Sequence, residues 1–184
     1  AGHTSDDYWN LTGPFGGATA ATLLRAVMEH PRRLGTPLSV TVNFCAPVAK
    51  GEFKITVREM RSNRSTQHWF MELAQADAGI TATATAVFAQ RRASWAHQAA
   101  RMPSAAAFES LPSLPTQGMM AWMQHYDFRF GSNMPRRLGP TPNAEPESAR
   151  SVVWINERRP RPLDFCSLLA FADTFFVRIF HVRG

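Results

Sequence analysis

The chain has 184 residues, of which 45% are hydrophobic and 11% aromatic, and this composition excludes a chain that is disordered throughout. No apolar run reaches the roughly 18–20 residues that cross a bilayer, so we expect no membrane span. The net charge is +6, and the arginines occur as scattered doublets, so we expect either a solvated basic face or a phosphate-bearing small ligand. No nucleic-acid-binding motif is visible, so we expect no nucleic-acid partner.

The first predicted element is a helix over Gly17–His30, which Pro31 ends. No ionisable side chain occurs between Tyr8 and Leu24, so we expect this helix to lie inside the protein. Segments with apolar residues at alternate positions follow, and short turns join them, so they predict an antiparallel sheet that wraps the helix. The four strands lie within 38–47, 51–60, 65–75 and 80–90.

Residues 96–117 are rich in Ala, Ser and Pro and predict a linker across the surface. A long strand is expected over 118–131, a mobile loop up to residue 149, and a further strand over 150–158. A second apolar helix follows over 162–180, with Pro162 in its first turn.

The second half therefore begins to repeat the first. We expect an α+β fold with one repeat over residues 1–95, a linker over 96–117 and a second, incomplete repeat over 118–184. By comparison with the first repeat, about 60 residues of strand are missing after the second helix. Either the chain is truncated there, which we favour, or another chain completes the sheet.

Five motifs resemble the acyl-CoA thioesterase II-like family, whose fold is the double hotdog: an antiparallel sheet curled around a central helix, arranged twice. FGGATAATLLRAV resembles the family's central-helix entry, and LSVTVNFCAPVAKGEF resembles a strand that ends in a proline turn. Residues Asn63-Arg64-Ser65-Thr66 resemble a Gly-Arg-Ser turn, with Asn63 in place of the glycine. ATAVFAQ resembles the closing strand of the first repeat, and LLAFADTFF the second-repeat helix that carries a catalytic aspartate. The resemblance spans residues 8–180.

The resemblance implies hydrolysis of an acyl-CoA thioester, with CoA as part of the substrate and no separate cofactor. Family members position a water molecule with an aspartate on the second helix and with a hydroxyl and a glutamine on later strands. Asp173 is the matching aspartate, and the positions of the other two groups fall beyond Gly184.

Asp173 is expected inside an apolar helix, on one face with Leu169, Phe176 and Phe180. A carboxylate in such a place tends to have a raised pKa, which suits a general base that takes a proton from water. The alternative is a solvated Asp173 that faces a gap in the sheet.

Gly16 and Gly17 open the first helix, where free N–H groups favour an oxyanion or a phosphate, although tight packing explains the glycines equally well. Arg64 and Ser65 would meet the phosphates of CoA, or else form a solvent-facing turn. We interpret His68 and His125 as packing residues, and the tryptophans at 69, 122 and 154 as core residues or as the border of an acyl tunnel.

Several classes of site are excluded, because the chain has no G-x-S-x-G elbow, no P-loop and no metal-binding motif. We expect a cytoplasmic homo-oligomer, since no signal peptide is visible and the two cysteines lie in apolar patterns. Two alternatives to a thioesterase stay open: a non-catalytic hotdog module that binds acyl-CoA or lipid, and a hotdog dehydratase or hydratase.

Overall fold

The computed structural model describes residues 1–135 and 150–175, and the chain divides into two compact units. The first unit contains residues 1–95 and 163–173, and the second contains residues 96–162 together with the end of the chain. Each unit is described by itself below. The division into two repeats and a linker, at the boundaries given above, stays a prediction.

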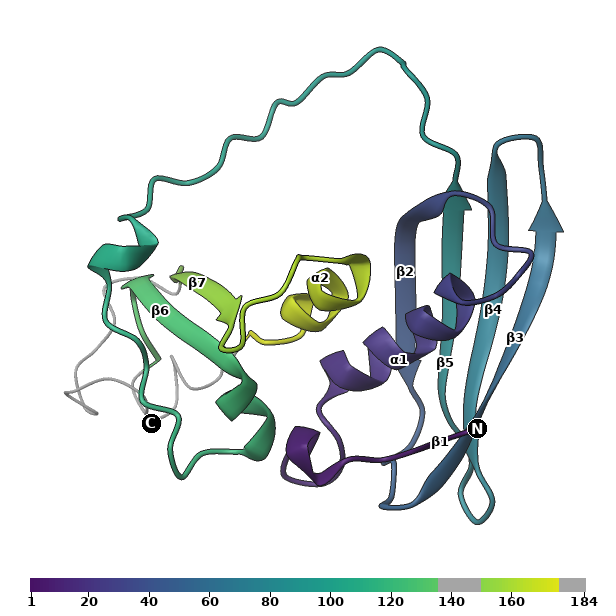
Figure 1. The fold of residues 1–184 in the computed structure, drawn as a ribbon, viewed down its shortest axis with the longest axis horizontal. Coiled ribbons are helices and arrows are strands. Elements are labelled where there is room, and N and C mark those ends of the chain that lie inside the picture. The colour runs from purple at the N-terminus through teal and green to yellow at the C-terminus, as the bar shows by residue number, and fades with distance from the viewer. Residues whose placement is uncertain (136–149, 176–184) are drawn as a thin grey trace. The chain divides into compact units, whose positions relative to one another are not determined.

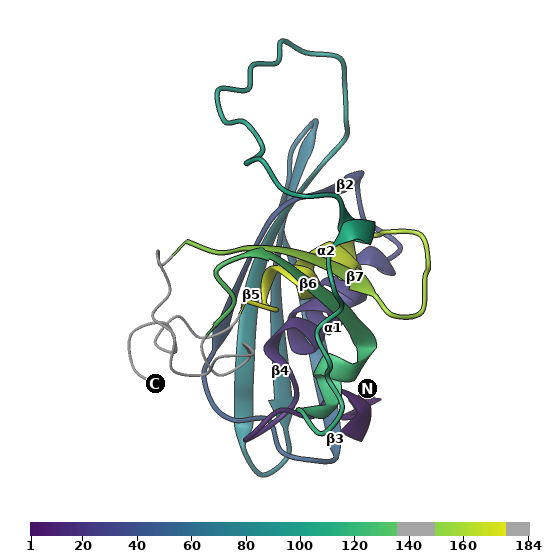
Figure 2. The ribbon, with the colours of Figure 1, turned by 90° about the vertical axis from the view of Figure 1, so that its left-hand side faces the viewer.

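The first unit is built on a curved sheet of five strands in the order β1-β3-β4-β5-β2, with all neighbours antiparallel (Figure 1, Figure 2). The strands are β1 (Gly2–His3), β2 (Thr36–Phe44), β3 (Glu52–Ser62), β4 (Thr66–Gln75) and β5 (Gly79–Ala89). Strands β2 to β5 agree with the four predicted from alternation. This confirms the expected α+β hotdog architecture of the first half.

The register of the strands defines two ends of this sheet. Ala89 pairs with both Thr36 and Thr66, so the start of β2, the start of β4 and the end of β5 lie together at what we call the Ala89 end. Phe44 pairs with Ala82 at the opposite end, which we call the Phe44 end.

Helix α1 (Gly16–Met28) contacts each of the strands β2 to β5. Its buried side chains Leu23, Leu24 and Val27 pack against the tryptophan, methionine and leucine of β4 and the small alanines of β5. Thr22 and Arg25 on its other side are exposed. The apolar character of the helix before Leu24 therefore follows from burial against the sheet, and charge begins where the helix meets solvent.

Helix α2 (Phe165–Ala172) packs against α1. It begins later than the sequence predicted, because the side chain of Asp164 caps it by accepting a hydrogen bond from the Ser167 N–H (2.7 Å). Pro162 thus precedes the helix, and the prediction that it lies in the first turn is wrong. Asp173 is the C-cap rather than an interior residue, and positions 176–180 of the expected helix lie outside the described residues.

The second unit contains the antiparallel pair β6 (Tyr126–Ser132) and β7 (Val152–Glu157), with short 3-10 helices at Phe108–Ser110 and Ala121–His125. The prediction of one long strand over 118–131 is therefore wrong in its first half. Trp122 and Met123 are adjacent and both buried, which a strand with alternating faces does not allow. The predicted strand over 150–158 is confirmed as β7.

Candidate active site

Asp173 lies where the C-terminal end of α2 meets the N-terminal end of α1. Its backbone N–H donates to the carbonyl of Ala170 and closes α2, while its carboxylate accepts a hydrogen bond from the backbone N–H of Gly17. The N-terminal end of a helix carries partial positive charge, which favours a carboxylate there. The carboxylate is thus held by the helix that faces it rather than by its own.

Gly16 and Gly17 make this approach possible. A Cβ atom at Gly16 would lie 2.6 Å from Oδ2 of Asp173 and 3.1 Å from the ring of Phe44. A Cβ atom at Gly17 would lie 2.7 Å from the carbonyl oxygen of Ala170. Both distances are too short for a real Cβ, so only glycine lets the last turn of α2 and its carboxylate reach the first turn of α1.

Burial raises the pKa of Asp173, and the hydrogen bond from Gly17 opposes this only in part. The side chain is nevertheless exposed to solvent on its other side, so water reaches the carboxylate. A carboxylate with a raised pKa that contacts both solvent and the start of a helix is suited to take a proton from a water molecule.

A cavity of about 340 Å³ adjoins this junction through Phe44, whose ring contacts Gly16. Its walls are mostly apolar and come from the segment before α1 and from the end of β2 and the turn after it: Asn10, Thr12, Gly13, Pro14, Thr19, Phe44, Cys45, Ala46, Pro47 and Val48. From the sequence, Phe44 and Cys45 are predicted only as strand residues. No local pattern predicts the cavity, because its walls come from two segments separated in the chain by α1 and β2.

The structure does not bring Arg64 and Ser65 to this junction. They form the turn between β3 and β4 at the Ala89 end, whereas Phe44 marks the other end of the sheet. The eight residue steps of β2 from Thr36 to Phe44 separate the two ends by about 26 Å at the rise of a strand. The predicted role of these two residues in binding CoA phosphates stays a prediction.

The histidines and tryptophans singled out earlier lie elsewhere. Trp69 is 1% exposed and its indole N–H donates to Gln67, so it belongs to the core, and Trp122 is also buried. His68 is exposed on β4, and His125 lies in a 3-10 helix rather than in a strand. Among residues 1–135 and 150–175, no group of three His, Cys, Asp or Glu side chains is placed to hold a metal ion.

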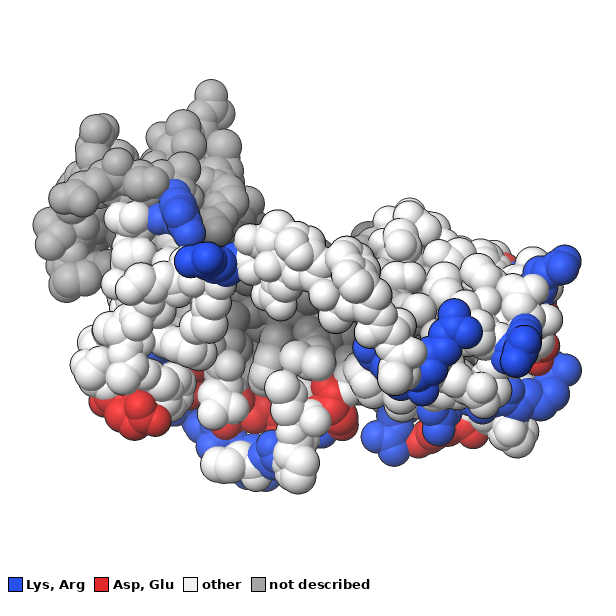
Figure 3. Space-filling view, turned by 90° about the horizontal axis from the view of Figure 1, so that it is seen from above, with Lys and Arg blue, Asp and Glu red and all other residues white. Residues whose placement is uncertain are grey.

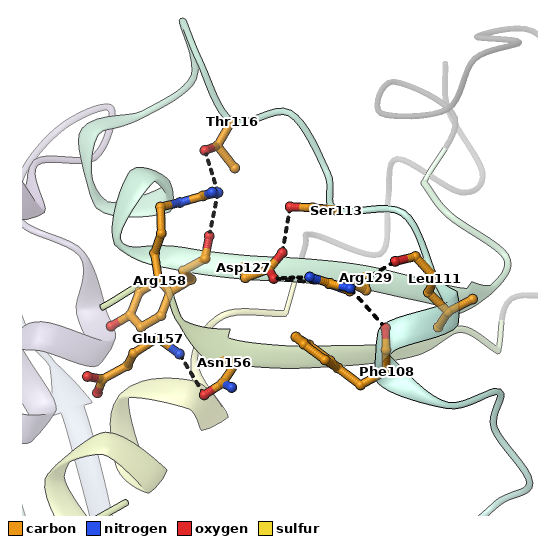
Figure 4. Close-up of polar contacts among 10 residues, drawn as sticks. Phe108, Leu111, Ser113, Thr116, Asp127, Arg129, Asn156, Glu157 and Arg158 are labelled. Carbon is orange, nitrogen blue, oxygen red and sulfur yellow. Dashed lines mark hydrogen bonds and ion pairs between the residues drawn. The ribbon is translucent and has the colours of Figure 1, made fainter. Parts of the chain in front are cut away.

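Two arginines of the second unit are occupied by the chain itself, as Figure 4 shows. Arg129 pairs with Asp127 (2.9 Å) and donates to the carbonyl groups of Phe108 and Leu111. Arg158 donates to the carbonyl groups of Gln124 and Tyr126 and to the hydroxyl of Thr116. These side chains fasten the segment 108–117 to β6, so they are structural rather than available to a ligand.

Comparison with known proteins finds a family model that matches the first half of the chain. Residues 5–89 match the family model of the acyl-CoA thioesterase N-terminal domain. No curated protein sequence matches the chain. Of the described residues, none form a helix long and apolar enough to cross a membrane.

Solved structures extend the similarity over the rest of the chain. A conserved protein of unknown function with a hot dog fold from Alicyclobacillus acidocaldarius is 41% identical, with a TM-score of 0.89 over 97% of this chain and 65% of that one. An acyl-CoA thioesterase II from Mycobacterium marinum is 24% identical, with a TM-score of 0.63 over 86% of this chain and 59% of that one. A tesB protein from Mycobacterium avium subsp. paratuberculosis is 18% identical, with a TM-score of 0.63 over 87% and 56%.

The chain spans less than two thirds of the length of each of these three proteins. The last two are too distant in sequence to show more than the fold. The family model covers α1 and strands β2 to β5, and the first of the solved structures, which has a hot dog fold, matches 97% of the chain. Together they confirm the resemblance of this chain to the acyl-CoA thioesterase II-like family of hotdog thioesterases.

Proposed function

We propose that the protein hydrolyses the thioester of fatty acyl-CoA, with Asp173 as the general base. The observation that carries the proposal is the placement of this carboxylate against the N-terminal end of α1, where Gly17 donates to it. The pKa of the carboxyl group is raised, and solvent reaches it from one side. No cofactor is needed for this chemistry beyond the CoA that is part of the substrate.

In the proposed reaction, Asp173 takes a proton from a water molecule while the water oxygen attacks the thioester carbonyl carbon. The carbonyl oxygen becomes an oxyanion, which the N–H of Gly16 in the first turn of α1 is suited to stabilise. The C–S bond then breaks, the sulfur leaves as a thiolate, and the proton held by Asp173 passes to it. The products are a free fatty acid and CoA. In the family that the chain resembles, a hydroxyl and a glutamine on later strands help to place the water.

We assign the cavity beside Phe44 to the acyl group of the substrate. Its lining is mostly apolar, and it adjoins the carboxylate through one aromatic ring. An apolar cavity of this size with few polar groups is typical of a small-molecule site.

The test compares Asp173→Asn with a control on the same helix, Asp164→Ala, in the full-length protein. Asp173→Asn keeps a hydrogen-bond acceptor for Gly17 but removes the base, so thiol release from acyl-CoA should be lost while acyl-CoA binding by calorimetry persists. Asp164→Ala removes the N-cap bond to Ser167 and should lower stability by about 1 kcal/mol with turnover retained. The exposed thiol of Cys45 must be titrated first, because it reacts with the same dye.

Retained turnover in Asp173→Asn would reject the proposal. Binding of acyl-CoA by the wild-type protein with no thiol release would instead support the second reading, a hotdog module that binds acyl-CoA or lipid. The dehydratase needs a histidine near the helix, and His68 does not supply one at the junction of α1 and α2, since it lies toward the Ala89 end. Assembly into homo-oligomers stays a prediction, which light scattering of the purified protein tests directly.

A further inference from the structure

Six exposed arginines gather at the Ala89 end of the sheet, far from the proposed active site. They come from three connections: the loop after α1, the β3–β4 turn with the end of β3, and the segment after β5. We call this set the arginine end: Arg32, Arg33, Arg61, Arg64, Arg91 and Arg92. Figure 3 looks onto this end of the sheet and shows basic side chains concentrated over it.

The three connections are locked to one another. Gly35 has a positive φ of 67°, and a Cβ there would clash with the Ala89 carbonyl oxygen, so the loop after α1 passes directly over the end of β5. Buried Gln67 accepts from the Leu34 N–H and donates to the Arg32 carbonyl and the Ser62 hydroxyl. The Gln90 N–H also donates to the Ser65 carbonyl (3.2 Å), so the start of the segment after β5 is held to the β3–β4 turn.

Little negative charge balances these arginines. Glu59 lies 3.5 Å from Arg32 and also accepts from Ser62, and its side chain is only 18% exposed. Arg61 and Arg91 each use one N–H on a neighbouring side chain, Asn63 and Thr36 respectively, which leaves most of their donors free for another group. Arg64 and Arg92 make no hydrogen bond or ion pair with any residue that the structure describes.

The spread of the set and its apolar neighbours indicate the kind of partner. The arginines extend from β3 to β2, three strand spacings or about 14 Å, which is wider than one phosphate group. Two large exposed apolar side chains belong to the same segments: Met60, 64% exposed, precedes Arg61, and Trp95, 85% exposed, follows Arg92 by three residues. Arginines bind phosphates, whereas tryptophan favours the boundary between lipid headgroups and acyl chains.

We propose that the arginine end docks on an anionic lipid bilayer. A single-stranded nucleic acid would pair with the arginines and stack a base on Trp95, but it gives no reason for the exposed Met60 beside Arg61. A basic residue near an anionic membrane surface contributes about 1 kcal/mol to binding. Docking is independent of the proposed hydrolysis, because the two regions lie at opposite ends of the sheet.

The test measures sedimentation of the protein with vesicles of phosphatidylcholine alone and with phosphatidylglycerol added. We expect binding only to the anionic vesicles, and weaker binding as salt increases. The variant Arg64→Gln/Arg92→Gln should bind about 30-fold more weakly. The control Lys54→Gln/Arg101→Gln removes the same net charge from exposed residues outside the arginine end and should bind like the wild type.

A second measurement follows Trp95 directly. Anionic vesicles should shift the tryptophan emission of the wild type to shorter wavelength, and Trp95→Phe should lose most of that shift while it keeps its unfolding midpoint. Equal binding to neutral vesicles, equal losses in the two double variants, or tighter binding to a single-stranded oligonucleotide than to anionic vesicles at the same salt would each overturn the proposal. Asp173→Asn should sediment like the wild type, which separates this result from the test of hydrolysis.

Discussion

Gln67 holds together four groups at the Ala89 end, and its replacement by leucine tests the energetics of the fold. The side chain is 2% exposed. Its Oε1 accepts from the Leu34 N–H and from Nε1 of Trp69, both at 2.9 Å, and its Nε2 donates to the Arg32 carbonyl and to Ser62. Leucine has a similar volume but no polar atoms, so packing changes little and the hydrogen bonds are lost.

The size of the effect follows from which groups water can reach. The indole N–H of Trp69 is in the core, and leaving a buried donor without a partner costs about 1–3 kcal/mol. The N–H of Leu34 is only partly buried and adds about 1 kcal/mol. The Arg32 carbonyl and the Ser62 hydroxyl lie at the surface, so water replaces their bonds. We therefore expect Gln67→Leu to lower the free energy of unfolding by about 2–4 kcal/mol.

Gln75 on the same strand is a matched control. It also makes three hydrogen bonds, with the N–H and carbonyl of Ala49 and with the carbonyl of Glu52, but these bonds are exposed. Gln75→Leu should therefore cost about 1 kcal/mol or less. Urea unfolding followed by circular dichroism measures both. A Gln67→Leu cost equal to that of Gln75→Leu would refute the reasoning, because burial would then not decide the penalty.

Three further predictions concern the site and the second unit. Asp173→Asn should raise the free energy of unfolding at pH 7, because burial raises the pKa of Asp173 and the charged carboxylate therefore destabilises the folded wild type at that pH. The wild type loses this penalty as the pH falls through the raised pKa. Urea titrations should therefore show no difference between the two proteins below the ordinary aspartate pKa of about 4. Gly17→Ala should lower the melting temperature, because its Cβ would meet the backbone of α2 at 2.7 Å. Gly131→Ala should not lower it, because no atom lies nearer than 3.7 Å to its Cβ. Equal shifts of the melting temperature in calorimetry would contradict the close packing of α1 and α2. Burial alone would raise the pKa of Asp127, but hydrogen bonds from Ser113 and Arg129 lower it, so Arg129→Met should raise this pKa in carboxyl NMR titrations. The same variant should speed amide exchange over 108–111, because Arg129 donates to the carbonyl groups of Phe108 and Leu111. Unchanged exchange there would show that Arg129 does not fasten this segment.

Local pattern in the sequence was sufficient for the first half of the fold. Alternation over β2 to β5 and the run without charge before Leu24 predicted a sheet packed on an apolar helix, because a strand and a buried helix each need a regular apolar face. The same reasoning failed over 118–125, where apolar residues are dense but not alternating. Density of apolar residues predicts burial, and only their period predicts the type of element.

The candidate site could be predicted only in part. Asp173, Gly16 and Gly17 were found from the resemblance and from their residue types, but Gly17 and the end of α2 at Ala172 are 155 positions apart in the chain, and only packing of the two helix ends brings them into contact. The arginine doublets appeared scattered along the chain, and the antiparallel register alone gathers three connections at one end of the sheet. The sequence by itself determined strands β2 to β5 and the buried helix α1, since a regular apolar period depends on neighbours along the chain. Tertiary structure decided the pKa of Asp173, the need for glycine on α1 and the surface that the arginines form, since each depends on groups that only folding places together.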